Sequence, residues 1–165
     1  MRLYLHCPWC GERLGPAEGN CQVCAACGEP TWQNAKPCGC AILQRDDGRV
    51  LLTRRAIEPF FGMWDVPGGF LEPDETPEQG VARELREETG LEVEVGRYVT
   101  AVVDTYGAGG DHTLNLFYEC RILRGDPQPA DDVSELGWFL PGELPLDAIA
   151  FENGAKGLRT WLTQR

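Results

Sequence analysis

Apolar residues in the middle of the chain fall into short runs that are typical of β-strands. Residues 40–44 and 50–54 form two such runs, and the Asp-Gly pair at 47–48 between them favours a tight hairpin turn. Later runs at 93–103, 113–123 and 136–140 predict further strands. The pattern therefore predicts a protein built largely around β-sheet.

A helix is predicted between Thr76 and Gly90. Thr76 suits the N-cap, Pro77 suits the first helical position, and Gln79 completes a capping box with the threonine. Gly90 suits the left-handed position that ends a helix. Gly80 lies inside this helix, where glycine costs about 1 kcal/mol relative to alanine and no local reason is evident.

A second helix is predicted at residues 153–162. Its apolar face, which indicates core packing, consists of Ala155, Leu158, Trp161 and Leu162. Residues 59–64 predict an aromatic loop, and Pro67-Gly68-Gly69 predicts a break in regular structure. Residues 29–37 predict a linker or a strap that docks on the larger domain. The order of strands, helix, strands and helix predicts an α/β fold with a mixed sheet and helices packed on it.

The length of 165 residues suits one ordinary domain, and 42% hydrophobic with 25% charged residues argues against bulk disorder. No apolar run approaches the roughly 18 residues of a membrane span. The first residues, MRLYLHCPWC, lack the long apolar core of a secretory signal, so we expect a cytoplasmic protein without membrane contact.

Eight cysteines are present, and four of them form two CxxCG sequences that begin at Cys7 and Cys24. Each sequence directs two thiolates toward one centre, so Cys7, Cys10, Cys24 and Cys27 together suit a structural Zn²⁺ site with no open position. Cys21 forms a competing CxxC pair with Cys24 and is the alternative ligand. Cys38, Cys40 and Cys120 lie in apolar runs and are expected to be small buried residues.

The net charge of −11 arises entirely after residue 36, where 23 acidic residues face 12 basic ones. Residues 1–36 balance three of each sign and contain no basic cluster. Nucleic-acid binding is therefore not expected. An acidic cleft can nevertheless hold a phosphorylated substrate when divalent cations bridge the like charges.

Three carboxylates recur at helical spacing inside the first predicted helix. Glu84, Glu87 and Glu88 share one face, while Val81 and Leu85 lie on another face that would pack against the sheet. The repulsion between the three carboxylates would be relieved by Mg²⁺, which takes carboxylate oxygens together with substrate phosphates. An ordinary solvated helix with Arg–Glu pairs is the alternative interpretation of this cluster alone.

The wider sequence GFLEPDETPEQGVARELREETGL at 69–91 matches G-x5-E-x7-R-E-u-x-E-E-x-G-u at every fixed position. This is the signature of the Nudix hydrolases, which the chain resembles from about residue 36 onward. The resemblance implies an α/β/α sandwich with a mixed sheet at 36–165, here preceded by a small N-terminal zinc ribbon at 1–35. It also implies Mg²⁺- or Mn²⁺-dependent hydrolysis of a nucleoside diphosphate linked to another moiety.

The same resemblance assigns expected roles to residues of the motif. Glu84, Glu87 and Glu88 would bind the catalytic metal together with the backbone carbonyl of Gly69, and Glu75 would pair with Arg83. The motif leaves the general base open. Glu84 is favoured for it, Glu135 and Asp132 are the alternates, and His112 is a weaker candidate.

A zinc ribbon ahead of such a domain resembles the NADH pyrophosphatase branch, which also removes NAD caps from RNA. The SQPWPFPxS motif of that branch is absent, so an ADP-containing small molecule, ADP-ribose or FAD, is the expected substrate and NADH or an NAD cap the alternative. Such relatives are often homodimers. The alternative from another functional class is an adaptor protein, in which the Nudix domain is only a non-catalytic scaffold.

The candidate substrate-binding residues are aromatic side chains for adenine and basic side chains for phosphate. They are Arg54, Arg55, Phe60, Phe61, Trp64 and Tyr106.

Overall fold

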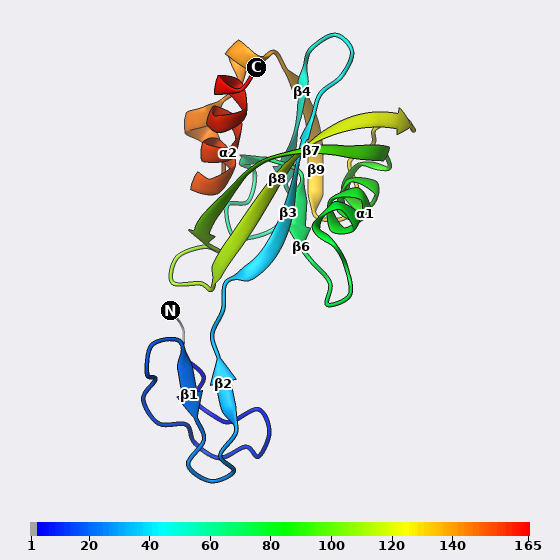
Figure 1. Cartoon of the computed structure of the whole chain (residues 1–165). Coiled ribbons are helices and arrows are strands. Elements are labelled where there is room, and N and C mark those ends of the chain that lie inside the picture. The colour runs from blue at the N-terminus through cyan, green and yellow to red at the C-terminus, as the bar shows by residue number, and fades with distance from the viewer. Residues whose placement is uncertain (1–2) are drawn as a thin grey trace.

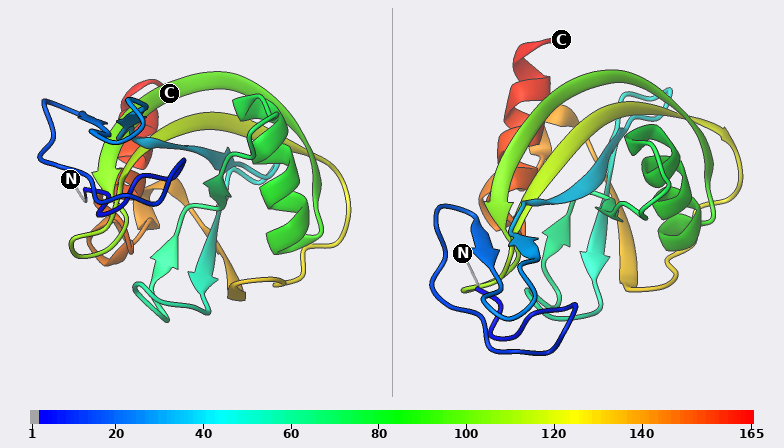
Figure 2. Two further views of the ribbon diagram at one scale, coloured as in Figure 1. Left: turned by 90° about the horizontal axis from the view of Figure 1, so that it is seen from below. Right: turned by 60° about the horizontal axis from the view of Figure 1, so that its bottom comes forward.

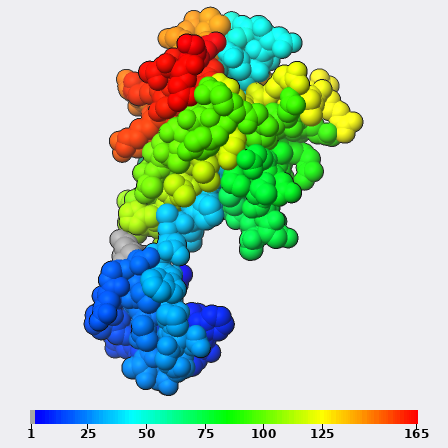
Figure 3. Space-filling model, viewed as in Figure 1, coloured from blue at the N-terminus to red at the C-terminus, as the bar shows by residue number. Residues whose placement is uncertain are grey.

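The computed structural model describes residues 3–165 and divides them between a small cysteine-rich segment and a larger body (Figure 1). The segment contains β1 (Cys21–Val23) and β2 (Pro30–Trp32), which pair in antiparallel fashion. Figure 3 shows this segment joined to the body by a narrow neck at the start of β3. Its only cluster of buried apolar residues consists, among the described residues, of Cys7, Leu14 and Cys24.

The body contains two sheets and two α-helices. Its elements are, in chain order, β3 (Lys36–Leu43), β4 (Val50–Arg55), β5 (Trp64–Asp65), β6 (Gly68–Phe70), α1 (Pro77–Thr89), β7 (Glu92–Thr105), β8 (His112–Arg124), β9 (Val133–Phe139), the 3-10 turns η1 (Pro141–Glu143) and η2 (Leu146–Ala148), and α2 (Glu152–Thr163). A four-stranded mixed sheet has the order β6-β3-β8-β7, with β3 and β8 parallel. A three-stranded antiparallel sheet has the order β5-β4-β9.

The two helices lie on opposite sides of the sheets, which gives the predicted α/β/α sandwich (Figure 2). On one side, Val81 and Leu85 of α1 pack in a cluster with Leu43 and Leu51. On the other side, the predicted apolar face of α2 joins a second cluster around Phe117. Neither helix within residues 3–165 is long and apolar enough to cross a membrane.

Helix α1 begins and ends where its local signals predict. Thr76 is the N-cap and forms both hydrogen bonds of the capping box with Gln79, while Gly90 adopts φ 72° at the C-terminal end. The structure also explains Gly80, because a Cβ there would collide with the side chain of Leu71 and lie 3.1 Å from Glu75 Oε2. This glycine lets the loop before the helix pack against it.

Three sequence expectations are wrong in detail. The turn at 45–49 forms, but its flanking strands enter different sheets and are bridged only at Gln44 and Val50 among the described residues, so there is no regular hairpin. Residues 29–37 are not simply a linker, because they contain β2 and the first residues of β3. Gly68 and Gly69 form part of β6 and pair with β3. A Cβ on Gly68 would collide with the carbonyl oxygen of Gly39, so the glycine allows the two strands to approach.

Candidate functional site

The helical spacing of the acidic residues in α1 brings its carboxylates to β6. Glu88 is buried, and its Oε2 accepts a hydrogen bond of 3.1 Å from the backbone N–H of Gly68. Gly69 lies against Glu84, since a Cβ at this glycine would be 2.5 Å from Glu84 Oε1. Glu87 extends toward solvent, with 43% of its side chain exposed. The glycines of β6 therefore form one wall of an acidic site.

A single guanidinium connects the acidic residues. Arg83 makes two hydrogen bonds of 2.6 and 2.9 Å to the carboxylate of Glu75, and its Nη1 donates to Glu84 and Glu87 at 2.9 Å each. It also donates to the carbonyl of Phe70 at 3.0 Å. The bidentate pair with Arg83 lowers the pKa of Glu75 to about 2. Arg83 therefore holds the loop, β6 and the acidic face of α1 in one arrangement.

For the other acidic groups of the site, burial and mutual repulsion raise the pKa. Burial raises the pKa of Glu88 well above its usual range, and the charges of Glu84 and Asp132 add to the effect. Burial also raises the pKa of Glu84, although Arg83 opposes the shift, and it raises the pKa of Asp132. Burial raises the pKa of Asp65 to about 6 despite the nearby Arg55. Acidic groups that repel one another in a partly buried site form an environment suited to a divalent cation.

A narrow pocket of about 60 Å³ lies beside this acidic site. Its lining combines aromatic, amide and acidic side chains with two cysteines: Cys38, Cys40, Arg55, Asp65, Val66, Gly68, Gly69, Phe70, Tyr106, Thr113, Asn115, Phe151 and Asn153. The Tyr106 and Phe151 rings stack at a centroid distance of 5.4 Å, and Arg55 lies over Phe151 at 5.1 Å. The pocket therefore joins the glycine wall of the acidic site to an aromatic surface.

The structure brings only some of the predicted substrate residues to this pocket. Arg55 and Tyr106 line it, with Arg55 Nη2 3.5 Å from the Tyr106 hydroxyl. Phe61 is exposed outside the pocket lining. Trp64 packs edge-on against a ring of the core, and Arg54 makes an ion pair of 2.8 Å with Glu135.

Phe60 also lies outside the pocket lining but packs edge-on against Phe151 at 5.0 Å. His112 is the exposed first residue of β8. Sequence reasoning did not single out Asn115 and Asn153 as site residues, because they come from β8 and from the start of α2, far apart in the chain. Asp65 and Phe151 were likewise absent from the predicted site residues. The signal that could have found these residues is polar side chains within otherwise apolar elements.

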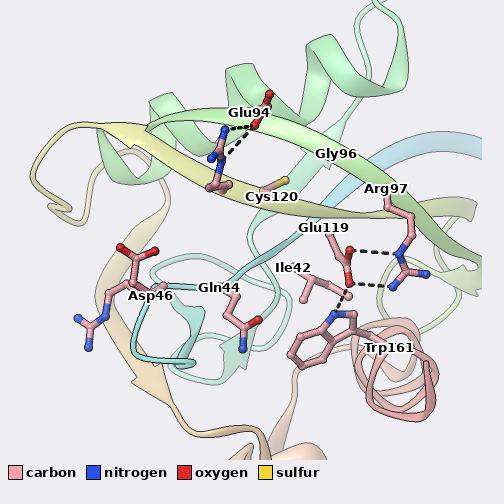
Figure 4. Close-up of a pocket in the computed structure, with 11 residues that line it drawn as sticks. Ile42, Gln44, Asp46, Glu94, Gly96, Arg97, Glu119, Cys120 and Trp161 are labelled. Carbon is pink, nitrogen blue, oxygen red and sulfur yellow. Dashed lines mark hydrogen bonds and ion pairs between the residues drawn. The ribbon is translucent and has the colours of Figure 1, made fainter. Parts of the chain in front are cut away.

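A wider hollow of about 410 Å³ lies elsewhere, between β7, β8 and α2 (Figure 4). Most of its charged side chains pair with one another or with neighbouring residues. Glu119 accepts hydrogen bonds from Arg97 and from the indole of Trp161, and Arg121 pairs with Glu94. Among the described charged residues that line this hollow, only Asp46 has no hydrogen bond or ion pair, so the hollow offers little that would select a ligand.

The cysteine-rich segment folds around two equivalent turns. In each turn the glycine N–H donates to the first cysteine carbonyl, Gly11 to Cys7 at 2.9 Å and Gly28 to Cys24 at 2.8 Å. Both glycines adopt φ close to 80°, which explains why glycine follows each second cysteine.

The two turns bring four sulfur atoms together. Those of Cys7, Cys10, Cys24 and Cys27 all lie within 4.8 Å of one another. Cys7 and Cys27 are separated by 3.7 Å and Cys10 and Cys24 by 3.6 Å. Sulfurs at about 2.3 Å from a tetrahedral Zn²⁺ lie about 3.8 Å apart, so the four cysteines can hold this metal. Cys21 lies on β1 and is not part of the cluster.

Comparison with known proteins agrees with this architecture. The family model of the NUDIX domain matches residues 36–162. The chain is 40% identical to a MutT-like protein of Streptomyces ambofaciens over 103 residues, which are 62% of each chain. It is 34% identical to an ADP-ribose pyrophosphatase of Methanocaldococcus jannaschii over 124 residues, which cover 73% of this chain and 70% of the relative. It is 30% identical over 146 residues to the NAD-capped RNA hydrolase NudC of Shigella flexneri, covering 88% of this chain but only 55% of that relative.

Solved structures show the same similarity. A NUDIX hydrolase from Nitrosomonas europaea superposes with a TM-score of 0.81 at 29% identity, over 98% of this chain and 92% of the other. An ADP-ribose pyrophosphatase from Streptococcus suis superposes with a TM-score of 0.64 at 26% identity, over 79% of this chain and 92% of the other. With its complete motif, its sandwich of sheets and helices and these relatives, the chain belongs to the Nudix family.

Proposed function

We propose that this protein hydrolyses the diphosphate bond of an ADP-containing nucleotide, ADP-ribose or FAD, and releases AMP. The observation that carries the proposal is the acidic face of α1 lying at the glycine wall of β6, directly beside an aromatic pocket. A diphosphate at the acidic face would place its nucleoside within reach of that pocket. The relative of M. jannaschii with 34% identity bears the name of an ADP-ribose pyrophosphatase, which supports this substrate class.

A divalent cation fits the donor set of the acidic site. Glu84 and Glu88 are held close to β6, Glu87 is accessible from solvent, and the Gly69 backbone lies beside the Glu84 carboxylate. We propose these four residues as the Mg²⁺ or Mn²⁺ ligands. When bound, the metal supplies charge neutralisation of the diphosphate and activation of water. Arg83 would keep Glu84 and Glu87 in position for that role.

Three carboxylates are candidates for the general base. Burial raises the pKa of Glu84 and of Asp132, and a base is more effective when its pKa lies nearer the working pH. Glu135 is exposed and paired with Arg54, so it is the weakest of the three. We propose Glu84 and keep Asp132 as the alternate. If the acidic limb of the pH–rate profile disappears in Asp132→Asn but not in Glu135→Gln, Asp132 is the base instead.

For the N-terminal segment we propose a structural zinc ribbon over residues 1–35, followed by the catalytic domain over 36–165. Four thiolates would leave the metal no open position, so it would stabilise the fold without taking part in hydrolysis. A segment whose buried apolar cluster is this small needs such a ligand to fold.

A turnover screen with purified full-length protein and Mg²⁺ tests the proposal. ADP-ribose, FAD, NADH, NAD-capped RNA, 8-oxo-dGTP and diadenosine polyphosphates are offered separately, and AMP release is measured. Release mainly from ADP-ribose or FAD is the expected result. Preference for NADH or capped RNA would instead support the second candidate, which the 30% identity to NudC over 88% of this chain favours. No turnover of any compound would refute the proposal and favour a non-catalytic adaptor.

A further inference from the structure

Two asparagines in the narrow pocket have fixed orientations. Asn115 Nδ2 donates to the carbonyl of Val102 at 3.1 Å and to Thr113 Oγ1 at 2.9 Å. Asn153 Nδ2 donates to Asp104 Oδ2 at 3.1 Å. A carbonyl and a carboxylate can only accept hydrogen bonds, so the nitrogen of each amide must face these partners.

The same contacts leave the amide oxygens for the pocket. Asn115 and Asn153 are 5% and 7% exposed, and no group in residues 3–165 donates a hydrogen bond to either Oδ1. Both side chains line the pocket. Both oxygens are therefore accessible from the pocket as acceptors, and they favour a ligand group that carries N–H or O–H.

A hydroxyl lies next to one of these acceptors. Thr113 Oγ1 accepts the bond from Asn115, which leaves its own proton available for a ligand. The pocket therefore offers acceptors beside a donor. Adenine presents the complementary arrangement, since its N6 amino group donates beside the acceptor N7, whereas a 6-oxo purine presents acceptors at both positions.

The shape of the pocket agrees with a purine edge. Its volume of about 60 Å³ is far below the roughly 300–1,000 Å³ of pockets that enclose a whole small molecule, which suits the edge of a ring better than a whole nucleoside. The rings of Phe70, Tyr106 and Phe151 line the pocket and contact one another, so they offer an aromatic surface for a base.

We propose that Asn115 and Asn153 determine base specificity by accepting hydrogen bonds from the exocyclic amino group of adenine. This inference rests on the proposed function, which places a nucleotide at the acidic face. Asp104 acts as a positioning residue, because its Oδ2 accepts from both the backbone N–H and Nδ2 of Asn153, at 2.8 and 3.1 Å.

The test compares ADP-ribose with IDP-ribose, in which hypoxanthine replaces adenine and the amino group becomes a keto oxygen. For the wild-type protein we expect kcat/KM for ADP-ribose to exceed that for IDP-ribose by about 10- to 100-fold, the range expected when a buried acceptor loses its donor. Equal values in an active enzyme would overturn the inference and leave the proposed function intact.

Variants separate base recognition from a structural role. Asn153→Ala keeps the backbone N–H that bonds Asp104, so the start of α2 remains capped, and we expect the substrate ratio to fall to within about 3-fold of unity. Asn115→Leu is the second variant, with the same expectation. A purely structural role would lower activity on both substrates equally and leave the ratio unchanged. The exposed Asn34→Ala is the control and should retain the wild-type ratio.

A binding measurement covers the case in which no substrate is turned over. ADP and IDP are then titrated into the wild-type protein with Mg²⁺ by calorimetry. Tighter binding of ADP by about 10-fold or more would support the base specificity even though the proposed hydrolysis has failed. Equal affinities would overturn the inference as well. Equal affinities for ADP and IDP together with weaker binding of 2′-deoxy-ADP would assign the acceptors to the sugar.

Discussion

Gly157 lies in the interior of α2, where helix propensity alone predicts that alanine would stabilise the protein by about 1 kcal/mol. The structure predicts the opposite sign. A Cβ at this position would lie 2.5 to 2.7 Å from three atoms of the Phe117 ring, about 1 Å closer than a comfortable carbon–carbon contact. Phe117 is completely buried among core residues, including Leu158 and Trp161, and cannot move away freely.

Overpacking of this kind costs roughly 1–3 kcal/mol, which exceeds the gain from propensity in most of that range. We therefore expect Gly157→Ala to lower the free energy of unfolding by up to about 2 kcal/mol, or Tm by up to about 8 °C for a chain of this size. Urea unfolding followed by circular dichroism measures the first quantity, and a thermal scan measures the second.

A double-mutant cycle isolates the contact. Phe117→Leu creates space at the ring, so the added methyl group of Gly157→Ala should cost less in that background, with a coupling energy of at least about 1 kcal/mol. If Gly157→Ala stabilises the wild-type protein by about 1 kcal/mol, or if the coupling is absent, the close approach of α2 to Phe117 does not limit the helix position.

Three further predictions concern charged and metal-binding groups. Glu88→Gln should reduce Mg²⁺-dependent turnover by at least about 100-fold, measured with Mg²⁺ present. Because burial raises the pKa of Glu88, the wild type should lose stability as pH rises and the variant should not; melting of both proteins at pH 5 and 8 in Mg²⁺-free buffer tests this. The wild type should lose about 3 kcal/mol of stability between pH 4 and 6, as pH rises through the raised pKa of Asp65, and Asp65→Asn should remove this loss. If the difference in unfolding free energy between variant and wild type stays constant across that window, the prediction is wrong. Cys10→Ser should release zinc and lower the melting temperature of the N-terminal segment. Cys21→Ser should retain one equivalent of zinc per chain, measured by atomic absorption. The reverse result would reassign the zinc ligands.

The sequence predicted best those features whose signals are local. The ends of α1 follow from Thr76 and Gly90, whose caps depend on neighbouring residues only. The convergence of the two CxxCG turns follows from equal local geometry around Gly11 and Gly28. Helix periodicity also placed the carboxylates of α1 on one face, where Arg83 contacts two of them.

Features that depend on distant partners could not be predicted. The turn at 45–49 looks like a hairpin turn because its residues are turn formers, but β3 pairs with β8 and β4 pairs with β9. The pocket residues likewise come from β3, β4, β5, β6, β8, the turn after β7 and the start of α2, and no spacing in the chain relates them. The sequence alone marks Gly80 only as a residue that destabilises a helix. Its reason lies in the packing, because the Leu71 side chain occupies the space that a Cβ at Gly80 would need.

The parallel pairing of β3 with β8 sets the order in which parts of the protein can form during synthesis. Lys36 lies opposite Thr113, and Leu43 lies opposite Cys120, so the central sheet cannot close until most of the chain has left the ribosome. The four clustered cysteines all precede residue 28. We expect the N-terminal segment to capture its metal early, while the first strand of the body waits for its partner.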